Sequence, residues 1–120
     1  MKRNENVLTR WIMLKQNQIS IETLLFNRGY KKIIIYGFGK IGECLFYELI
    51  NSGVTLEGIV DKRGKNLVVD YPCTTIENMG GMEADAVVVT VLSDYENIKK
   101  CIKEKMDVDV ISIEELIYEL

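Results

Sequence analysis

Hydrophobic positions follow a helical period in the first part of the chain. Apolar residues recur at helical spacing over about residues 4–16, which predicts a first helix. Ser20 is a good N-cap for a second helix through about residue 27, and Gly29 is its expected stop. The residues of the first apolar face are Val7, Leu8, Trp11, Ile12 and Leu14.

From residue 32 onward the pattern changes to short, nearly continuous apolar runs that alternate with helical patterns. Such runs are typical of parallel strands that are buried on both faces of a sheet. Strands are expected at 32–36, 56–60, 86–92 and 108–111. Helices are expected at 41–51, from Ser93 to about Lys105, and after Ser112.

Three sequence signatures of a capping box suggest where helices begin. They are Thr74-x-x-Glu77, Ser93-x-x-Glu96 and Ser112-x-x-Glu115. The first predicts a short helix just before Gly80 and Gly81, in the stretch whose pattern is hardest to read.

The alternation of strands and helices predicts an α/β fold. Repeated β–α units with right-handed crossovers give a doubly wound parallel sheet, here Rossmann-like with about five strands. We expect residues 1–29 to form an N-terminal helical extension and residues 30–120 the Rossmann-like domain. The two extra helices either cover an edge of the sheet or pair their apolar stripe with another subunit, so a homodimer through this region stays open.

Length and composition limit the function. The chain has 120 residues, of which 48% are hydrophobic and 28% charged, which fits one globular domain without a separate substrate domain. A net charge of −3 argues against a nucleic-acid partner. No apolar run approaches the roughly 20 residues that span a bilayer, and the first ten residues lack the apolar core of a signal peptide, so a cytoplasmic protein without membrane insertion is expected. Three cysteines without CxxC spacing suggest free thiols, and since there is no histidine we expect neither a metal site nor the usual general base.

The most informative motif is Gly37-x-Gly39-x-x-Gly42, which follows the first apolar strand and opens a helical pattern. In a dinucleotide-binding turn the first glycine permits the tight turn, and the second lets the backbone approach a diphosphate. The third allows the helix to pack closely on the strand. The start of the helix then offers free N–H groups to the phosphates. The motif therefore predicts a nucleotide diphosphate ligand.

Asp61 ends the next apolar run, where an acid would accept hydrogen bonds from ribose hydroxyls. Lys62 and Arg63 would neutralise a 2′-phosphate, but Asp61 would repel it, so NAD(H) is favoured over NADP. S-adenosylmethionine is a minor option, because its proteins usually carry an acid just before the glycines and this chain has Ile35 and Tyr36 there.

The predicted contacts come from the glycine turn, the acidic turn and the fourth strand. Thr90 and Ser93 lie where such sheets present side chains to a ligand, although Ser93 is equally explained as an N-cap. Tyr95-x-x-x-Lys99 matches the Tyr–Lys pair of short-chain dehydrogenases but falls in the wrong helix, so no catalytic residue is predicted. The predicted cofactor-binding residues are Gly37, Phe38, Gly39, Lys40, Ile41, Gly42, Asp61, Lys62, Arg63 and Thr90.

The segment KKIIIYGFGKIGECLFYELINSGVTLEGIVDKR, from Lys31 to Arg63, resembles small Rossmann domains of bacterial polysaccharide biosynthesis. These are the N-terminal domains of sugar acyltransferases and the nucleotide-binding part of sugar-nucleotide dehydratases; the later segments YPCTTIENM and EADAVVVTV resemble the same group. The resemblance implies that residues 37–41 line a diphosphate and that Asp61 contacts the ribose. The acyltransferases' left-handed catalytic helix and the dehydratases' catalytic half have no counterpart in this sequence.

A second resemblance is to the NAD-binding regulatory domains of potassium transporters, through ADAVVVTVLSDYENI. Those domains usually carry a Gly-Asp pair after the third strand, which residues 69–76 lack.

These observations predict a nucleotide-binding module for NAD(H) or a nucleotide sugar that is not catalytic as an isolated chain. A UDP-sugar and NADP are the other ligands considered. The alternatives are an NAD-responsive regulatory domain and a small oxidoreductase or sugar-modifying subunit that a partner enzyme completes.

Overall fold

The computed structural model describes residues 2–118 and places a five-stranded parallel sheet at the centre of the fold. The strand order is β3-β2-β1-β4-β5. The strands are β1 (Lys32–Tyr36), β2 (Thr55–Val60), β3 (Cys73–Thr74), β4 (Ala86–Val89) and β5 (Asp109–Ser112). The α-helices are α1 (Lys2–Gln16), α2 (Ile21–Asn27), α3 (Lys40–Leu49), α4 (Tyr95–Lys105) and α5 (Ile113–Tyr118), and the 3₁₀ helices are η1 (Gly64–Asn66) and η2 (Ile76–Gly81).

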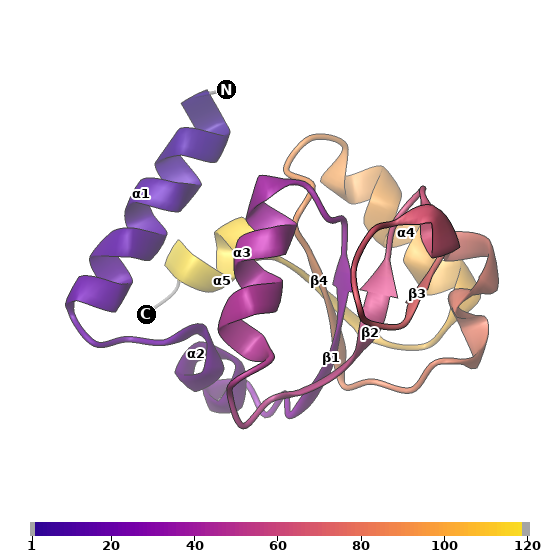
Figure 1. Ribbon diagram of the computed structural model, residues 1–120, viewed down its shortest axis with the longest axis horizontal. Coiled ribbons are helices and arrows are strands. Elements are labelled where there is room, and N and C mark those ends of the chain that lie inside the picture. Colours follow the sequence, from indigo (N-terminus) through magenta and orange to yellow (C-terminus); the bar gives the residue numbers. More distant parts are fainter. Residues whose placement is uncertain (1, 119–120) are drawn as a thin grey trace.

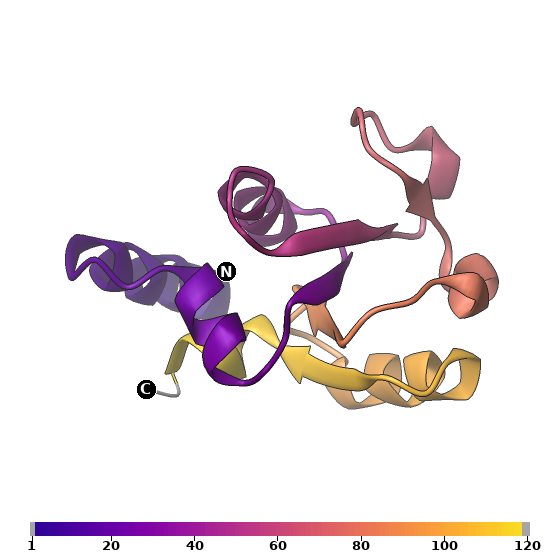
Figure 2. The same cartoon turned by 90° about the horizontal axis from the view of Figure 1, so that it is seen from below.

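Helices cover both faces of the sheet, which confirms the predicted doubly wound α/β fold (Figures 1 and 2). The central strand β1 is buried on both faces because its alternate side chains enter two different cores. Ile33 and Ile35 pack with α1, α2, α3 and α5, whereas Ile34 packs with α4 and η2.

The strand order also defines where a ligand can approach. From β1 the chain crosses to β2 on one side, and from β4 it crosses to β5 on the other. The connections therefore diverge between β1 and β4, and in open α/β sheets the crevice for a ligand lies at this point, outside the carboxyl ends of the strands.

The N-terminal helices pack against the rest of the chain. Val7, Trp11 and Leu14 are buried in the same core as α3 and α5. The indole N–H of Trp11 donates to Glu48 of α3 at 2.9 Å, and the backbone N–H of Ile21 donates to the other oxygen of Glu48 at 2.7 Å. Val7, Trp11 and Leu14 of the first apolar face are thus used within the chain, whereas Ile12 of the same face is exposed, so pairing with another subunit stays a prediction.

Two helices begin at other residues than the sequence predicts. Thr74 lies in β3, and the 3₁₀ helix η2 after it has Thr75 at its N-cap without a side-chain capping bond, so the first capping box is wrong. Ser93 is not the N-cap of α4 either, because Asp94 takes that position in the left-handed region with φ of 61°. By contrast, Ser20 accepts from Thr23 N as predicted, and Ser112 accepts from Glu114 N.

None of the helices within residues 2–118 is long and apolar enough to cross a membrane.

Candidate nucleotide site

Two hollows meet at the carboxyl edge of the sheet, on either side of the glycine turn. The larger one, which we call the main cleft, measures about 790 Å³, and the smaller one, the α1-side hollow, about 450 Å³. The two hollows share Gly39, Val91 and Ser93. The main cleft is lined by Tyr36, Gly37, Phe38, Gly39, Asp61, Lys62, Arg63, Ile76, Val91, Ser93, Asp94, Asn97, Ile98 and Cys101.

Each glycine of the turn has a different environment. Gly37 has φ of +94°, and a Cβ atom there would lie 2.8 Å from Thr90 Oγ1. A Cβ on Gly42 would lie 2.1 Å from the carbonyl oxygen of Gly37. Gly37 and Gly42 therefore serve the packing of the turn itself. A Cβ on Gly39 would meet no atom within 4 Å beyond its chain neighbours, so the space over Gly39 is open.

The amino end of α3 faces the same space. Gly39 is its N-cap without a side-chain capping bond, and the first intrahelical bond runs from Glu43 N to Gly39 O at 2.9 Å. The N–H groups of Lys40, Ile41 and Gly42 precede that bond and stay available to an acceptor. With the positive end of the helix dipole, they favour an anion.

The carboxylate of Asp61 is held by the glycine turn and by Arg63. Its Oδ2 accepts from the backbone N–H of Phe38 at 2.9 Å. Its Oδ1 accepts from Arg63 N at 2.9 Å and Arg63 Nε at 2.8 Å, and Arg63 Nη2 also donates to the carbonyl of Phe38 at 2.9 Å. The hydrogen bond from the Arg63 side chain is the largest of the effects that hold the pKa of Asp61 below its ordinary value, while partial burial acts against it.

This arrangement changes which group the cleft presents to a ligand. The Asp61 side chain is only 11% exposed, whereas that of Arg63 is 53% exposed. A ribose diol that donates to Asp61 would have to share the carboxylate with the guanidinium or displace it. The predicted contact between Asp61 and a ribose stays a prediction, and Arg63 is its direct competitor.

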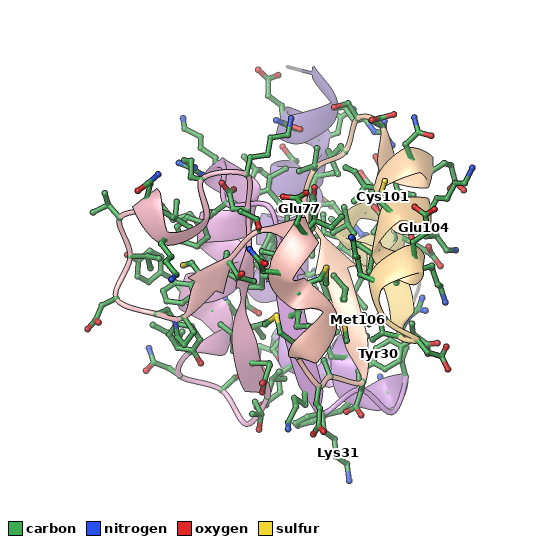
Figure 3. The ribbon with its side chains drawn as sticks, turned by 90° about the vertical axis from the view of Figure 1, so that its right-hand side faces the viewer. Tyr30, Lys31, Glu77, Cys101, Glu104 and Met106 are labelled. Atoms are coloured by element: carbon green, nitrogen blue, oxygen red, sulfur yellow. The ribbon has the colours of Figure 1, made fainter. Side chains whose placement is uncertain are left out.

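The opposite wall of the main cleft comes from η2, α4 and the loop before α4. Ile76, Val91 and Ile98 give it an apolar surface, and Asp94 and Asn97 add polar groups. The sequence pattern did not single out Ile76, Asn97 or Ile98 as site residues. They come together here because η2 packs beside α4. Figure 3 shows Glu77 and Cys101 towards the carboxyl edge, with Tyr30 and Lys31 at the opposite edge.

Tyr36 closes the cleft from the end of β1. Burial is the main effect that raises the pKa of its hydroxyl, and the nearby Cys101 and Asp61 act in the same direction. The phenol is therefore protonated at neutral pH and is a hydrogen-bond donor there.

The side chain of Thr90 contacts the backbone of the glycine turn. This side chain is buried, and its hydroxyl lies 2.8 Å from the carbonyl of Tyr36 and 3.0 Å from that of Gly37. Thr90, Lys40, Ile41 and Gly42 line the α1-side hollow and not the main cleft, so the ten predicted contacts divide between the two hollows. In the Tyr95-x-x-x-Lys99 match, the hydroxyl of Tyr95 donates a hydrogen bond to the carbonyl oxygen of Val110 at 3.1 Å.

Fold and site together define a Rossmann-like α/β domain with an open glycine turn at the switch point of its sheet. The chain belongs to the C2185-like N-terminal domain family, whose model matches residues 29–114. This range includes β1 to β5 and leaves out α1 and α2. Neither the curated proteins nor the solved structures contain a match to the chain.

Proposed function

We propose that the protein is a nucleotide-binding module that holds NAD(H) or a nucleotide sugar across its glycine turn. The observation that carries this proposal is the open space over Gly39, between two hollows and in front of the free N–H groups of α3. A diphosphate would accept from these N–H groups, and the two hollows would take the groups on either side of it.

The same site favours binding over catalysis. The titratable side chains around the main cleft are Tyr36, Asp61, Lys62, Arg63, Asp94 and Cys101. Asp61 is paired with Arg63 and Tyr36 holds its proton, and the sequence has no histidine to act as a general base near neutral pH. Catalysis would have to use Lys62, Asp94 or Cys101, or acid–base groups from a partner.

Gly39→Ala separates ligand binding from folding. The added methyl meets no protein atom beyond its neighbours, and φ of −80° suits alanine, so the variant should unfold at the wild-type temperature. The methyl would occupy the space where a diphosphate approaches the backbone. Gly81→Ala is the matched control, because Gly81 also has open space around its Cβ position and lies in η2.

The test is thermal unfolding with and without NAD+, NADP+, UDP-glucose or S-adenosylmethionine, followed by calorimetry. At about 100 times Kd a ligand would stabilise the wild type and Gly81→Ala by about 2.7 kcal/mol. Gly39→Ala should lose this stabilisation. The proposal fails if NAD+, NADP+ and UDP-glucose all leave the wild type unstabilised, or if Gly39→Ala binds as tightly as the control.

A further inference from the structure

The α1-side hollow has walls from three parts of the chain, one of which lies outside the family match. It is lined by Arg3 and Asn4, by residues 39–42 of the glycine turn and by residues 90–93. Arg3 and Asn4 belong to α1, whereas the family model begins at residue 29. The first turn of the N-terminal helix therefore borders the glycine turn.

Three contacts hold α1 in this place. Its apolar face is buried in the core, as described above, and Trp11 is bonded to Glu48. Arg3 Nη2 donates to Glu114 of α5 at 2.6 Å, and Arg3 Nε lies 3.2 Å from both oxygens of the same carboxylate. Figure 1 shows the amino end of α1 at the same edge of the molecule as the start of α3.

The polar groups around the hollow are mainly hydrogen-bond donors. Arg3 donates to Glu114 through Nε and Nη2, whereas its Nη1 makes no hydrogen bond to the described part of the chain. Lys40 likewise has no ion pair within residues 2–118. Asn4 and Ser93 add an amide and a hydroxyl, and no carboxylate belongs to the described lining of this hollow. Such a surface suits a hydroxyl-rich, uncharged or anionic group and disfavours a cationic one.

We infer that α1 completes the ligand site, and that the α1-side hollow receives a sugar attached to the second phosphate of a nucleoside diphosphate. This inference rests on the proposed function, because it needs the nucleotide in the main cleft and the diphosphate over Gly39. The α1-side hollow has a volume of about 450 Å³, which lies within the range of small-molecule sites. Arg3 is the residue that contacts the sugar half and discriminates it from a bare diphosphate.

Two pairs of probes measure the contribution of the hollow: UDP with UDP-glucose, and ADP with ADP-ribose. Calorimetry on the full chain gives the affinity for each. Arg3→Gln removes the guanidinium, and Glu114→Gln removes the carboxylate charge from the same pair but keeps the guanidinium in the chain. Lys103→Gln, on the exposed side of α4, is the matched loss of one positive charge.

One of the two pairs of probes should bind to the wild type. For the sugar-bearing member of that pair, we expect Arg3→Gln to weaken the affinity by about fivefold to tenfold, which corresponds to about 1.0–1.4 kcal/mol. The affinity for UDP or ADP alone should change less than twofold. Glu114→Gln and Lys103→Gln should keep the preference for the glycosylated ligand. Thermal unfolding of each variant without ligand shows whether α1 remains docked, and a loss of preference in Glu114→Gln equal to that in Arg3→Gln would assign the effect to docking and overturn the inference.

The two proposals fail in different ways. If wild type binds UDP or ADP but Arg3→Gln discriminates the glycosylated ligand as wild type does, the inference is wrong and the nucleotide site stands. If wild type binds none of these four probes but is stabilised by NAD+ or NADP+, the inference is wrong and the proposed function stands. If no nucleotide binds, both are wrong.

Discussion

Asp61 and Phe38 join the ends of two neighbouring strands through a 2.9 Å hydrogen bond from the backbone N–H of Phe38 to Asp61 Oδ2. Phe38 lies within the glycine turn after β1, and Asp61 directly follows β2. Arg63 bonds to both partners, since its side chain donates to the carboxylate of Asp61 and to the carbonyl of Phe38. The conformation of the glycine turn is thus tied to Asp61, the acid that the sequence pattern predicts as a ribose contact.

Asp61→Asn should lower stability in a pH-dependent way. The pKa of Asp61 is lowered in the folded chain, so its contribution is present above the unfolded value of 3.8 and is lost as pH falls through the folded pKa. Urea unfolding should show the variant less stable than wild type at about pH 7, with a smaller difference at about pH 3. An equal difference at both pH values would show that the charge of Asp61 contributes nothing.

Arg63→Ala should lower the affinity for NADP+ relative to that for NAD+. The guanidinium neutralises Asp61, and its removal leaves a carboxylate beside the place where a 2′-phosphate would lie. Calorimetry with both dinucleotides at low and high salt measures the ratio, which should recover partly at high salt. Lys65→Ala removes the same charge from an exposed position nearby and should leave the ratio unchanged. A parallel loss for both ligands would contradict a charge effect of Arg63.

Gly42→Ala should destabilise the fold without any ligand present. The added Cβ would lie 2.1 Å from the carbonyl oxygen of Gly37, so α3 has to move away from the turn. Overpacking of this kind costs about 1–3 kcal/mol. Urea unfolding against Gly81→Ala measures it, and wild-type stability in Gly42→Ala would mean that the close approach of helix and turn is not required.

Glu48→Ala should loosen the N-terminal helices. The carboxylate of Glu48 accepts from Trp11 Nε1, Lys15 Nζ and Ile21 N, and its removal leaves the partly buried indole and amide donors without a partner. We expect a loss of about 2 kcal/mol. The fluorescence of the single tryptophan and hydrogen exchange in α1 report on this region.

Glu43→Ala removes an exposed carboxylate from the same helix and is the control for Glu48→Ala. If the amides of α1 exchange equally slowly in both variants, Glu48 does not hold the N-terminal helices.

The apolar runs predicted the sheet well because a strand buried on both faces leaves little choice of residue. The runs at 32–36 and 56–60 coincide with β1 and β2 within one residue. The run at 86–92 is longer than β4, which ends at Val89. The next residue, Thr90, places its hydroxyl against the carbonyl oxygens of Tyr36 and Gly37.

The capping boxes were less reliable because a capping box is a local signal and tertiary contacts override it. Thr74 pairs with Val60 as part of the short edge strand β3, so it is not free to begin a helix. Before α4, the left-handed conformation of Asp94 moves the helix start one residue beyond the predicted cap, and its carboxylate accepts from Asn97.

The candidate site was predictable where it depends on backbone geometry. The glycine pattern located the turn, and the environments of Gly37 and Gly42 match the roles assigned to them. The second wall of the cleft and the contribution of Arg3 and Asn4 depend on how η2, α4 and α1 pack, and no local pattern encodes that packing.

The most direct test of a nucleotide site at the glycine turn is a titration of the wild-type protein with ADP, followed by amide NMR. The account predicts that the largest shifts fall on the amides of residues 39–42, with a second group at residues 61–63. Shifts confined to other parts of the chain, or none with ADP, NAD+ or UDP-glucose, would contradict it.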